Sequence, residues 1–233
     1  MSETHKREFA ERLRSEWLIS FCEARTDDFR PEGFSEKSLD RLESHDAYWF
    51  MRAVDSGLVS QSDGFFTSPK SAAKEQIFWS GRNGTGCRDT YLWSEPVITI
   101  GAYARLVEEH NWPIDLVGTQ SKYPWPFDLV CYEAGTDEER IVCEVKKATR
   151  EIDKMVDQMK SYGRLKPLAA EPTCSIERNS YRKAKGIRVS WPKFLWALGP
   201  GSQGHVYEIV RQAGTALFSL VERDSTSLDY GSN

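Results

Sequence analysis

Three residues near the middle of the chain, Asp128, Glu144 and Lys146, have types and a spacing that suggest metal chemistry. Asp128 lies in the run Phe-Asp-Leu-Val-Cys-Tyr of residues 127–132, and the other two lie in Ile-Val-Cys-Glu-Val-Lys-Lys of residues 141–147. Two carboxylates that face each other across neighbouring strands repel and destabilise a sheet. A bound cation would remove this conflict, because carboxylate oxygens are preferred ligands of hard divalent ions.

A β-hairpin is the element that would bring these residues together. Both runs are rich in β-forming residues, and the polar gap between them contains a glycine and several charges, which favours a hairpin turn. If Tyr132 pairs with Arg140, the register places Asp128 directly opposite Glu144, with Lys146 on the same face. The other face is then wholly apolar, as a buried sheet face should be. It consists of Phe127, Leu129, Cys131, Ile141, Cys143 and Val145.

A helix is predicted on each side of the hairpin. Ser94-Glu95-Pro96 opens the first, and its last turn contains Glu108 and Glu109, whose charges oppose the helix dipole. The second covers residues 150–163 and ends at Gly163. This second helix is amphipathic, with a buried stripe of Ile152, Met155, Val156 and Met159.

The segment around Asp128 has an internal counterpart. Trp-Pro-Ile-Asp-Leu-Val at residues 112–117 recurs as Trp-Pro-Phe-Asp-Leu-Val at residues 125–130, and we interpret the two as adjacent strands with Pro at the strand entrance. Asp115 therefore competes with Asp128, but only Asp128 lies in the predicted hairpin. Gln120, which ends the first of these strands, is a candidate for the polar lining of the same site, with a solvent-facing position as the alternative.

Asp, a short interval and then Glu-x-Lys at the end of the next strand resembles the motif of the PD-(D/E)XK nuclease superfamily, with features of its RecB and Mrr types. The resemblance covers residues 95–165. It implies a restriction-endonuclease-like fold of the α/β (α+β) class, with a mixed central sheet flanked by helices. It also implies hydrolysis of phosphodiester bonds with a divalent metal, Mg²⁺ or Mn²⁺.

The resemblance implies a role for each residue of the motif. Asp128, Glu144 and the backbone carbonyl of Val145 would bind the metal ion together with a further acid from the preceding helix. The candidates for that acid are Glu108 and Glu109 and, as a weaker alternative, Glu95. Lys146 would orient or help to deprotonate the attacking water and would neutralise the developing negative charge.

Two residues of the helix after the hairpin support the same interpretation. Gln158 and Tyr162 are four residues apart, so they share one face of the helix. Gln-x-x-x-Tyr after Glu-x-Lys resembles a motif of the RecB-type exonuclease branch, where it lies beside the active site. The alternative is that Gln158 is an edge residue and Tyr162 belongs to the core.

The charge of the chain is distributed unevenly. The net charge is −4, but residues 140–193 contain 14 Lys and Arg against 6 Asp and Glu, so this segment carries +8 and the rest carries −12. One basic surface is enough to bind a phosphate backbone, and the basic and aromatic residues of 180–186 suit phosphate contact with base stacking. The predicted nucleic-acid contacts are Lys147, Arg182, Lys183 and Lys185. DNA is the expected partner and RNA the alternative, while a solvated charged face is the simplest competing explanation.

The predicted organisation has three parts: a helical N-terminal appendage over residues 1–86, the nuclease-like core over 87–223 and a polar tail over 224–233 without regular structure. The glycines between residues 81 and 86 mark the boundary, since a regular element does not tolerate so many. Helices of the N-terminal region are expected over residues 4–26, 35–57 and 68–79. Near the end of the core, Trp191, Phe194 and Trp196 are spaced for a helix packed on the sheet, and residues 205–222 for a closing hairpin.

Length and composition favour one large domain, or one domain with an appendage, in a chain of 233 residues. The five cysteines contain no Cys-x-x-Cys pair, so neither a disulfide framework nor a zinc site is predicted. No apolar run has membrane-spanning length, and the first residues lack the apolar segment of a signal peptide. These features predict a cytoplasmic protein without membrane contact.

The leading hypothesis is a Mg²⁺-dependent nuclease that cleaves DNA. A nuclease-fold protein that binds nucleic acid or serves as a scaffold subunit, without cleaving, is the alternative from another functional class. A third interpretation is that the charged triad is solvent-facing decoration of the hairpin. A homodimer would suit double-strand cutting.

Overall fold

The computed structural model describes residues 3–25, 28–83, 86–120, 127–165 and 170–232. Its centre is a mixed six-stranded sheet in the order β11-β10-β9-β8-β7-β6. β8 and β9 are parallel, and the other neighbours in this sheet are antiparallel. The strands are β6 (Val117–Thr119), β7 (Leu129–Tyr132), β8 (Glu139–Val145), β9 (Phe194–Leu198), β10 (Gly204–Arg211) and β11 (Phe218–Arg223).

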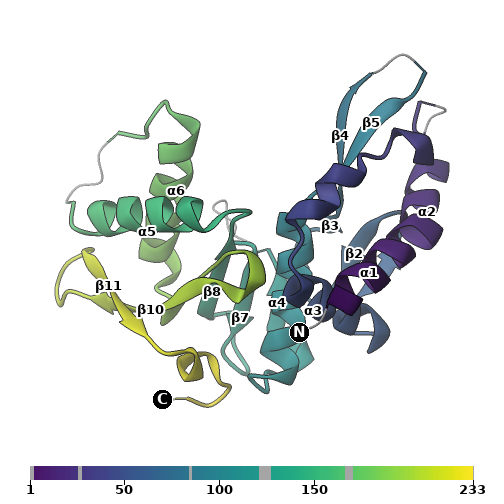
Figure 1. Cartoon of the computed structure of the whole chain (residues 1–233). Coiled ribbons are helices and arrows are strands. Elements are labelled where there is room, and N and C mark those ends of the chain that lie inside the picture. The colour runs from purple at the N-terminus through teal and green to yellow at the C-terminus, as the bar shows by residue number, and fades with distance from the viewer. Residues whose placement is uncertain (1–2, 26–27, 84–85, 121–126, 166–169, 233) are drawn as a thin grey trace.

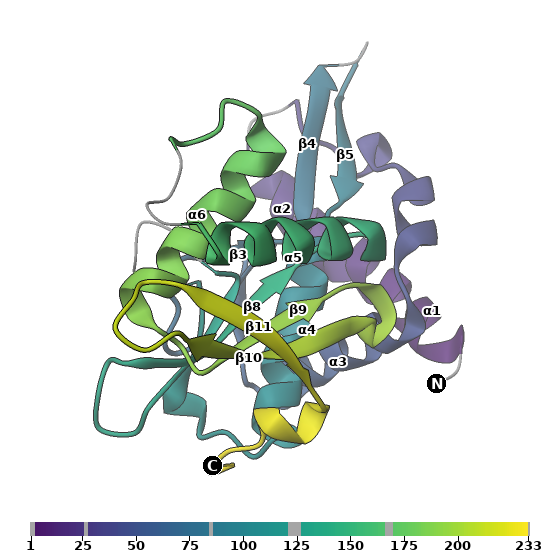
Figure 2. The same ribbon diagram turned by 90° about the vertical axis from the view of Figure 1, so that its left-hand side faces the viewer.

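Helices cover both faces of this sheet (Figures 1 and 2). α4 (Ser94–Glu108) packs on one face, and α5 (Thr149–Gly163) and α6 (Ser175–Ser190) lie on the other. Successive residues of a strand point to opposite faces, so Leu129 and Cys131 join the core beneath α4 while Val130 joins the core beneath α5 and α6. The prediction of a mixed sheet flanked by helices is confirmed at this level.

The first predicted helix is present as α1 (Glu3–Arg12), a π-helical turn over Leu13–Trp17 and α2 (Leu18–Glu23). Its apolar side chains at helical spacing are fully buried: Phe9, Leu13, Trp17 and Phe21. The second predicted helix is divided into a 3₁₀ turn (Glu36–Arg41) and α3 (Ser44–Asp55), and α3 packs along α4. One hydrophobic core joins this N-terminal region to the central sheet, since Phe9 and Cys143 belong to the same cluster of buried residues.

The predicted third helix over residues 68–79 is wrong. Residues 68–79 instead contain a turn, β3 (Glu75–Gln76) and the start of β4 (Phe78–Asn83). β3 forms a small sheet with β1 (Ser60–Ser62) and β2 (Phe65–Thr67), and β4 pairs with β5 (Arg88–Leu92) in a projecting hairpin (Figure 1). Ser68, assigned to the helix start, instead bonds through its backbone N–H to the Ser71 hydroxyl at 2.9 Å and begins a turn. Gly81, predicted in the boundary loop, lies within β4, where a Cβ would come within 2.8 Å of the Tyr91 ring.

Two predictions near the C-terminus are also wrong. The segment around Trp196 is not a helix but β9, whose side chains are all buried because both faces of the central sheet are covered. The tail was expected to lack structure, but it contains a 3₁₀ turn (Ser225–Leu228) in which Leu228 is buried. Trp112 Nε1 donates a hydrogen bond to the Leu228 carbonyl at 2.6 Å, which holds this turn against the chain. The closing hairpin is confirmed as β10 and β11.

Helices in the described ranges do not reach the combination of length and apolar character that crossing a bilayer requires.

Candidate active site

The predicted register of the hairpin is confirmed over the three pairs from Leu129 with Cys143 to Cys131 with Ile141. The pair nearest the turn differs, because a bulge places Tyr132 opposite Glu139 instead of Arg140. The register at the charged end of the hairpin does not depend on that pair, so the predicted proximity of the carboxylates survives the error.

Asp128 immediately precedes β7 and reaches across to the end of β8. Its Oδ2 accepts a hydrogen bond from the Val145 backbone N–H at 2.6 Å. Its own carbonyl accepts from the Gln120 N–H at 2.8 Å, which ties it to the end of β6. Phe127 was predicted on the apolar face with Leu129, but it packs in the opposite core, because the strand alternation begins only at β7.

Glu144 lies on β8 with 2% of its surface exposed, between two ammonium groups. Its Oε1 accepts a hydrogen bond from Lys146 Nζ at 2.6 Å, and its Oε2 forms an ion pair with Lys183 Nζ. Lys146 Nζ also donates to the Val145 carbonyl at 2.9 Å. Lys183 comes from α6, and its ammonium lies 4.7 Å from the centroid of the Phe127 ring.

The carboxylates of this cluster differ in acidity. Burial, and then the charge of Glu144, raise the pKa of Asp128 to about 7. Burial acts in the same direction on Glu144, but the Lys183 and Lys146 ammonium groups outweigh it and hold the pKa of Glu144 below its usual value. Burial alone would lower the pKa of Lys146, and the charges of Glu144 and Asp128 raise it instead. The burial of Asp128 is therefore only partly offset by its hydrogen bond from Val145 and by the two ammonium groups.

Glu75 of β3 is a site residue that the sequence did not reveal. It is 8% exposed, and its Oε1 accepts a hydrogen bond from Gln120 Nε2 at 3.2 Å. Burial, and then the charge of Asp128, raise its pKa to about 7. The segment before Glu75 is hydrogen-bonded to β6, since the Ala72 N–H donates to the Thr119 carbonyl at 3.0 Å. Through this hydrogen bond to Glu75, Gln120 takes the first of its two predicted roles, as polar lining of the site and not as a solvent-facing residue.

The helix acid beside the site is Glu95, at the start of α4. Its Oε1 accepts a hydrogen bond from the Lys147 backbone N–H at 3.2 Å, directly after β8. Glu108 lies about 20 Å further along the helix axis, at a rise of about 1.5 Å per residue. The carboxylates of Glu108 and Glu109 pair there with Arg52 at 2.7 Å and with Arg105 at 2.8 Å, respectively. The structure does not bring the two preferred candidates to the cluster, and it does bring the weaker one.

Gln158 and Tyr162 connect α5 to α6. The Gln158 Oε1 accepts a hydrogen bond from the Ser180 hydroxyl at 2.7 Å. The Tyr162 ring packs edge to face on Tyr181, with centroids 5.5 Å apart. Because α6 also supplies Lys183, these contacts position the Lys183 ammonium at Glu144, which is the role the structure supports for them.

The four predicted nucleic-acid contacts have different environments. Lys147 and Lys185 are exposed, whereas Arg182 is paired with Glu171 at 2.6 Å. Lys183 is 5% exposed and bound to Glu144, so its assignment to a nucleic-acid surface is wrong. A basic residue of α6 that faces the sheet cannot be distinguished by composition from one that faces solvent.

A basic cleft of about 620 Å³ opens between the end of β8 and helices α5 and α6. Lys147, Arg150 and Lys154 are exposed along it, and none of the three has an acidic partner among the residues that the structure describes. Among the residues that the structure describes, the lining consists of Lys146, Lys147, Arg150, Glu151, Lys154, Met155, Ser175, Asn179 and Ser180. Lys146 belongs both to this cleft and to the carboxylate cluster.

Asp115, the competing aspartate, is exposed in the 3₁₀ turn Ile114–Leu116 before β6. β6 and β7 are adjacent, as the repeated segment predicts. The Trp and Pro of the second repeat, at 125 and 126, lie outside the described residues. Asp128 is the aspartate that joins Glu144.

The donor set fits a hard divalent cation only in part. Asp128 and Glu144 provide two carboxylates and Val145 a carbonyl, and Mg²⁺ in proteins is commonly held by one or two carboxylates with water completing the shell. Within the described ranges, no three His, Cys, Asp or Glu side chains are grouped so as to hold a metal ion. A bound ion would therefore rely on few protein ligands.

The elements that carry this cluster come from four separate parts of the chain: β3, the start of α4, the β7–β8 hairpin and α6. Comparison with known proteins finds no family model, no curated protein and no solved structure that matches the chain.

Proposed function

We propose that this protein is a metal-dependent nuclease that hydrolyses phosphodiester bonds of DNA, on a restriction-endonuclease-like core. The observation that carries the proposal is the contact of Asp128 Oδ2 with the Val145 N–H at 2.6 Å, which holds a carboxylate of raised pKa beside Glu144. Two carboxylates and a lysine on adjacent strand ends are the arrangement that the sequence resemblance implies. A buried carboxylate whose burial is only partly offset destabilises a fold, and groups of this kind cluster at functional sites.

Asp128, Glu144 and the Val145 carbonyl would hold Mg²⁺ or Mn²⁺. The ion, when bound, acidifies a coordinated water and neutralises charge on the phosphate. Lys146 places its ammonium at the same carboxylate and carbonyl, where it can hold the attacking water and stabilise negative charge on the phosphate oxygens. Glu95 fixes the chain after β8 through the Lys147 N–H and so helps to position Lys146.

The basic cleft supports DNA as the substrate. Its three unpaired cations, Lys147, Arg150 and Lys154, follow one another from the end of β8 along α5. Phosphates of a strand lying there would be held beside Lys146, and their binding would weaken steeply as the salt concentration rises.

A second candidate is a nucleic-acid-binding or scaffold subunit that does not cleave. The observation that favours it is the pairing of Glu144 with two ammonium groups, from Lys146 and Lys183, which compensates the charge of this carboxylate without a metal ion. Buried ion pairs of this kind are also found as purely structural features.

Incubation of supercoiled plasmid with the protein and Mg²⁺ or Mn²⁺ tests the proposal. We expect cleavage by the wild type and a loss of at least about 100-fold in Asp128→Asn and in Lys146→Met. Asp115→Asn is the matched control, since it changes the exposed aspartate of the repeated segment, and it should cut normally.

No cleavage by the wild type of linear, circular or single-stranded DNA with either metal would overturn the nuclease proposal. DNA binding that persists in that case would support the second candidate. Undiminished cleavage by Asp128→Asn would show that the cluster is not the catalytic site.

A further inference from the structure

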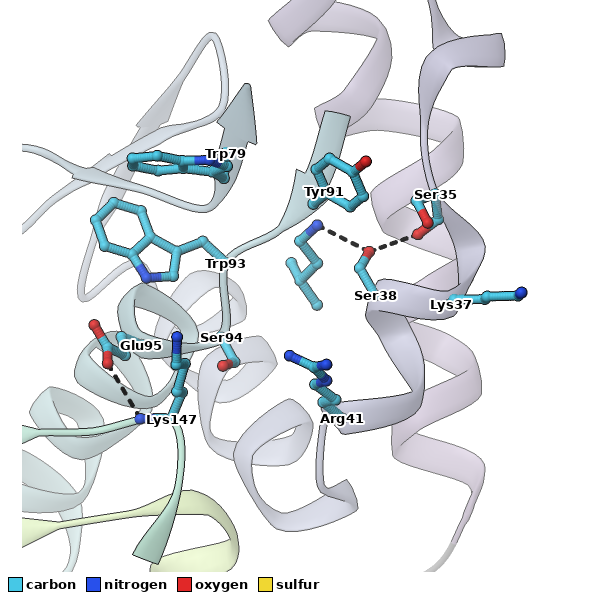
Figure 3. A pocket seen from close by; sticks show the side chains of 11 residues that line it. Ser35, Lys37, Ser38, Arg41, Trp79, Tyr91, Trp93, Ser94, Glu95 and Lys147 are labelled. Carbon is cyan, nitrogen blue, oxygen red and sulfur yellow. Dashed lines mark hydrogen bonds between the residues drawn. The ribbon is translucent and has the colours of Figure 1, made fainter. Parts of the chain in front are cut away.

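A second cleft of about 620 Å³ lies beside the candidate active site (Figure 3). It is formed by the 3₁₀ turn Glu36–Arg41, the β4–β5 hairpin and the start of α4. Its volume is within the range of about 300–1,000 Å³ that is usual for small-ligand sites. Glu95 and Lys147 form the wall shared with the catalytic cluster. The described residues that line it are Ser35, Lys37, Ser38, Arg41, Trp79, Tyr91, Leu92, Trp93, Ser94, Glu95 and Lys147.

One side of this cleft is aromatic. Trp79 is 58% exposed although it is one of the largest apolar side chains, and its cross-strand partner Tyr91 is 36% exposed. The Trp93 ring packs edge to face against Trp79, with centroids 5.4 Å apart and an interplanar angle of 79°. This contact orients the Trp79 ring from one side and leaves much of its surface open to the solvent.

The other side carries positive charge. In Figure 3 the Arg41 and Lys147 side chains point into the cleft, whereas Lys37 points away from it. Arg41 and Lys147 form no ion pair with any described residue. The acidic side chain of the lining, Glu95, uses its Oε1 to bind the Lys147 backbone N–H. The cleft therefore offers a stacking surface and two available cations at the edge of the catalytic site.

We propose that this cleft binds an unpaired nucleotide of the DNA substrate, with its base stacked on Trp79 and its phosphates held by Arg41 and Lys147. Aromatic stacking combined with cations along the backbone is how proteins bind single strands without reading sequence. A paired base inside a duplex has both faces covered by its neighbours, so an exposed ring such as Trp79 selects a nucleotide outside the stack. The inference rests on the proposed function, because it takes the occupant to be DNA.

Lys147 gives the proposal a geometric consequence, because it lines both this cleft and the basic cleft along α5. A strand that runs from one cleft to the other passes the end of β8, where Lys146 and Glu144 lie. The substrate would then be DNA with an unpaired segment next to the bond that is cut.

The test is the binding of a fluorescent single-stranded oligonucleotide of about 12 nucleotides, measured by anisotropy in EDTA. All variants carry Asp128→Asn, so binding is read without any cleavage. We expect Trp79→Ala to weaken binding by about 5- to 150-fold, the range measured for loss of one base stack. Trp79→Phe should retain most of the affinity because it keeps a ring. Tyr230→Ala removes another exposed aromatic side chain, 44% exposed on the C-terminal segment, and should have no effect.

Two further measurements separate this cleft from general attraction to DNA. Arg41→Ala should lower the salt dependence of single-strand binding by about one phosphate contact. Trp79→Ala should change binding of a blunt duplex by less than about twofold, because stacking is lost only for unpaired bases. An equal loss on duplex and single strand would overturn the proposal.

Single-strand binding that is unchanged in Trp79→Ala, or absent in the parent protein, would also overturn it, whatever the outcome of the plasmid assay. Conversely, if the protein binds single strands through Trp79 but never cuts DNA, the proposed nucleotide cleft is supported and only the proposed nuclease activity is refuted.

Discussion

Replacing Glu75 with Gln examines the electrostatics of the site through the stability of the fold. Burial and the charge of Asp128 raise the pKa of Glu75 from 4.5 to about 7. A carboxylic acid whose pKa is higher in the folded than in the unfolded chain binds its proton more tightly when folded. Its contribution to stability is therefore fully present below pH 4.5 and is lost as the pH rises towards about 7. A difference of about 2.5 between the two pKa values corresponds to about 3 kcal/mol.

Gln keeps the shape of Glu75 but carries no charge at any pH. We expect Glu75→Gln to match the wild type within about 1 kcal/mol at pH 4.5 and to exceed it by up to about 3 kcal/mol at pH 8. Urea unfolding at several pH values between these limits measures the difference, provided that the slope against urea is unchanged. Glu23→Gln, at an exposed position of α2, controls for the general effect of removing one negative charge.

A constant difference between Glu75→Gln and the wild type across this pH range would refute the reasoning. It would mean that the pKa of Glu75 is the same in the folded and the unfolded chain, as for a solvated carboxylate. A variant less stable than the wild type at pH 8 would be a stronger contradiction, because the charged form would then be the favoured one.

Three further predictions concern the neighbouring contacts. Glu144→Gln should cost about 3–5 kcal/mol in urea unfolding, and adding Lys183→Met should recover part of this loss, whereas strict additivity would show that the two residues do not interact. Glu95→Gln should reduce plasmid cleavage by more than about tenfold while Glu108→Gln leaves it within about twofold, and the reverse result would place the helix acid at the other end of α4. Leu228→Ala should lower the free energy of unfolding by about 2–4 kcal/mol because this side chain is 1% exposed, and a loss below about 1 kcal/mol would show that the C-terminal turn is not packed.

The sequence predicted the hairpin and its flanking helices because local rules govern them. Successive residues of β7 and β8 point to opposite faces of the sheet, so grouping the apolar side chains on one face gave the register from Leu129 with Cys143 to Cys131 with Ile141. Ser94-Glu95-Pro96 and Gly163 are strong start and stop signals, and α4 and α5 have boundaries within a residue of these signals. Asp128 and Glu144 were brought together by the same local argument.

The remaining features depend on contacts between distant parts of the chain. Glu75 reaches the site because its segment is bonded to β6, and nothing near residue 75 in the sequence reports that pairing. Lys183 is buried because it pairs with Glu144. The basic composition of its segment does not report this distant partner, so the sequence predicted a surface cation. The strand β9 was assigned to a helix because a short apolar run buried on both faces has no periodicity of its own.

The acidic residue predicted on the helix before the hairpin was misplaced for a different reason. Glu108 and Glu109 attracted attention because their charges oppose the dipole at the end of α4. Arg52 and Arg105 compensate for those charges, so the feature has a structural cause. Glu95, at the favourable end of the same helix, carried no such signal although it lies nearer to Asp128, Glu144 and Lys146.

The parallel pairing of β8 with β9 has a consequence for the order in which the protein is made. β6, β7 and β8 are joined by short connections and can associate early, but β8 gains its second neighbour only after α5 and α6 have been synthesised. Pairing across such a long crossover closes late in folding. A nascent chain that stops before α6 has Glu144 without the Lys183 ammonium and an unpaired β8 edge. The charged cluster is therefore completed only after α6, which carries Lys183, has been synthesised.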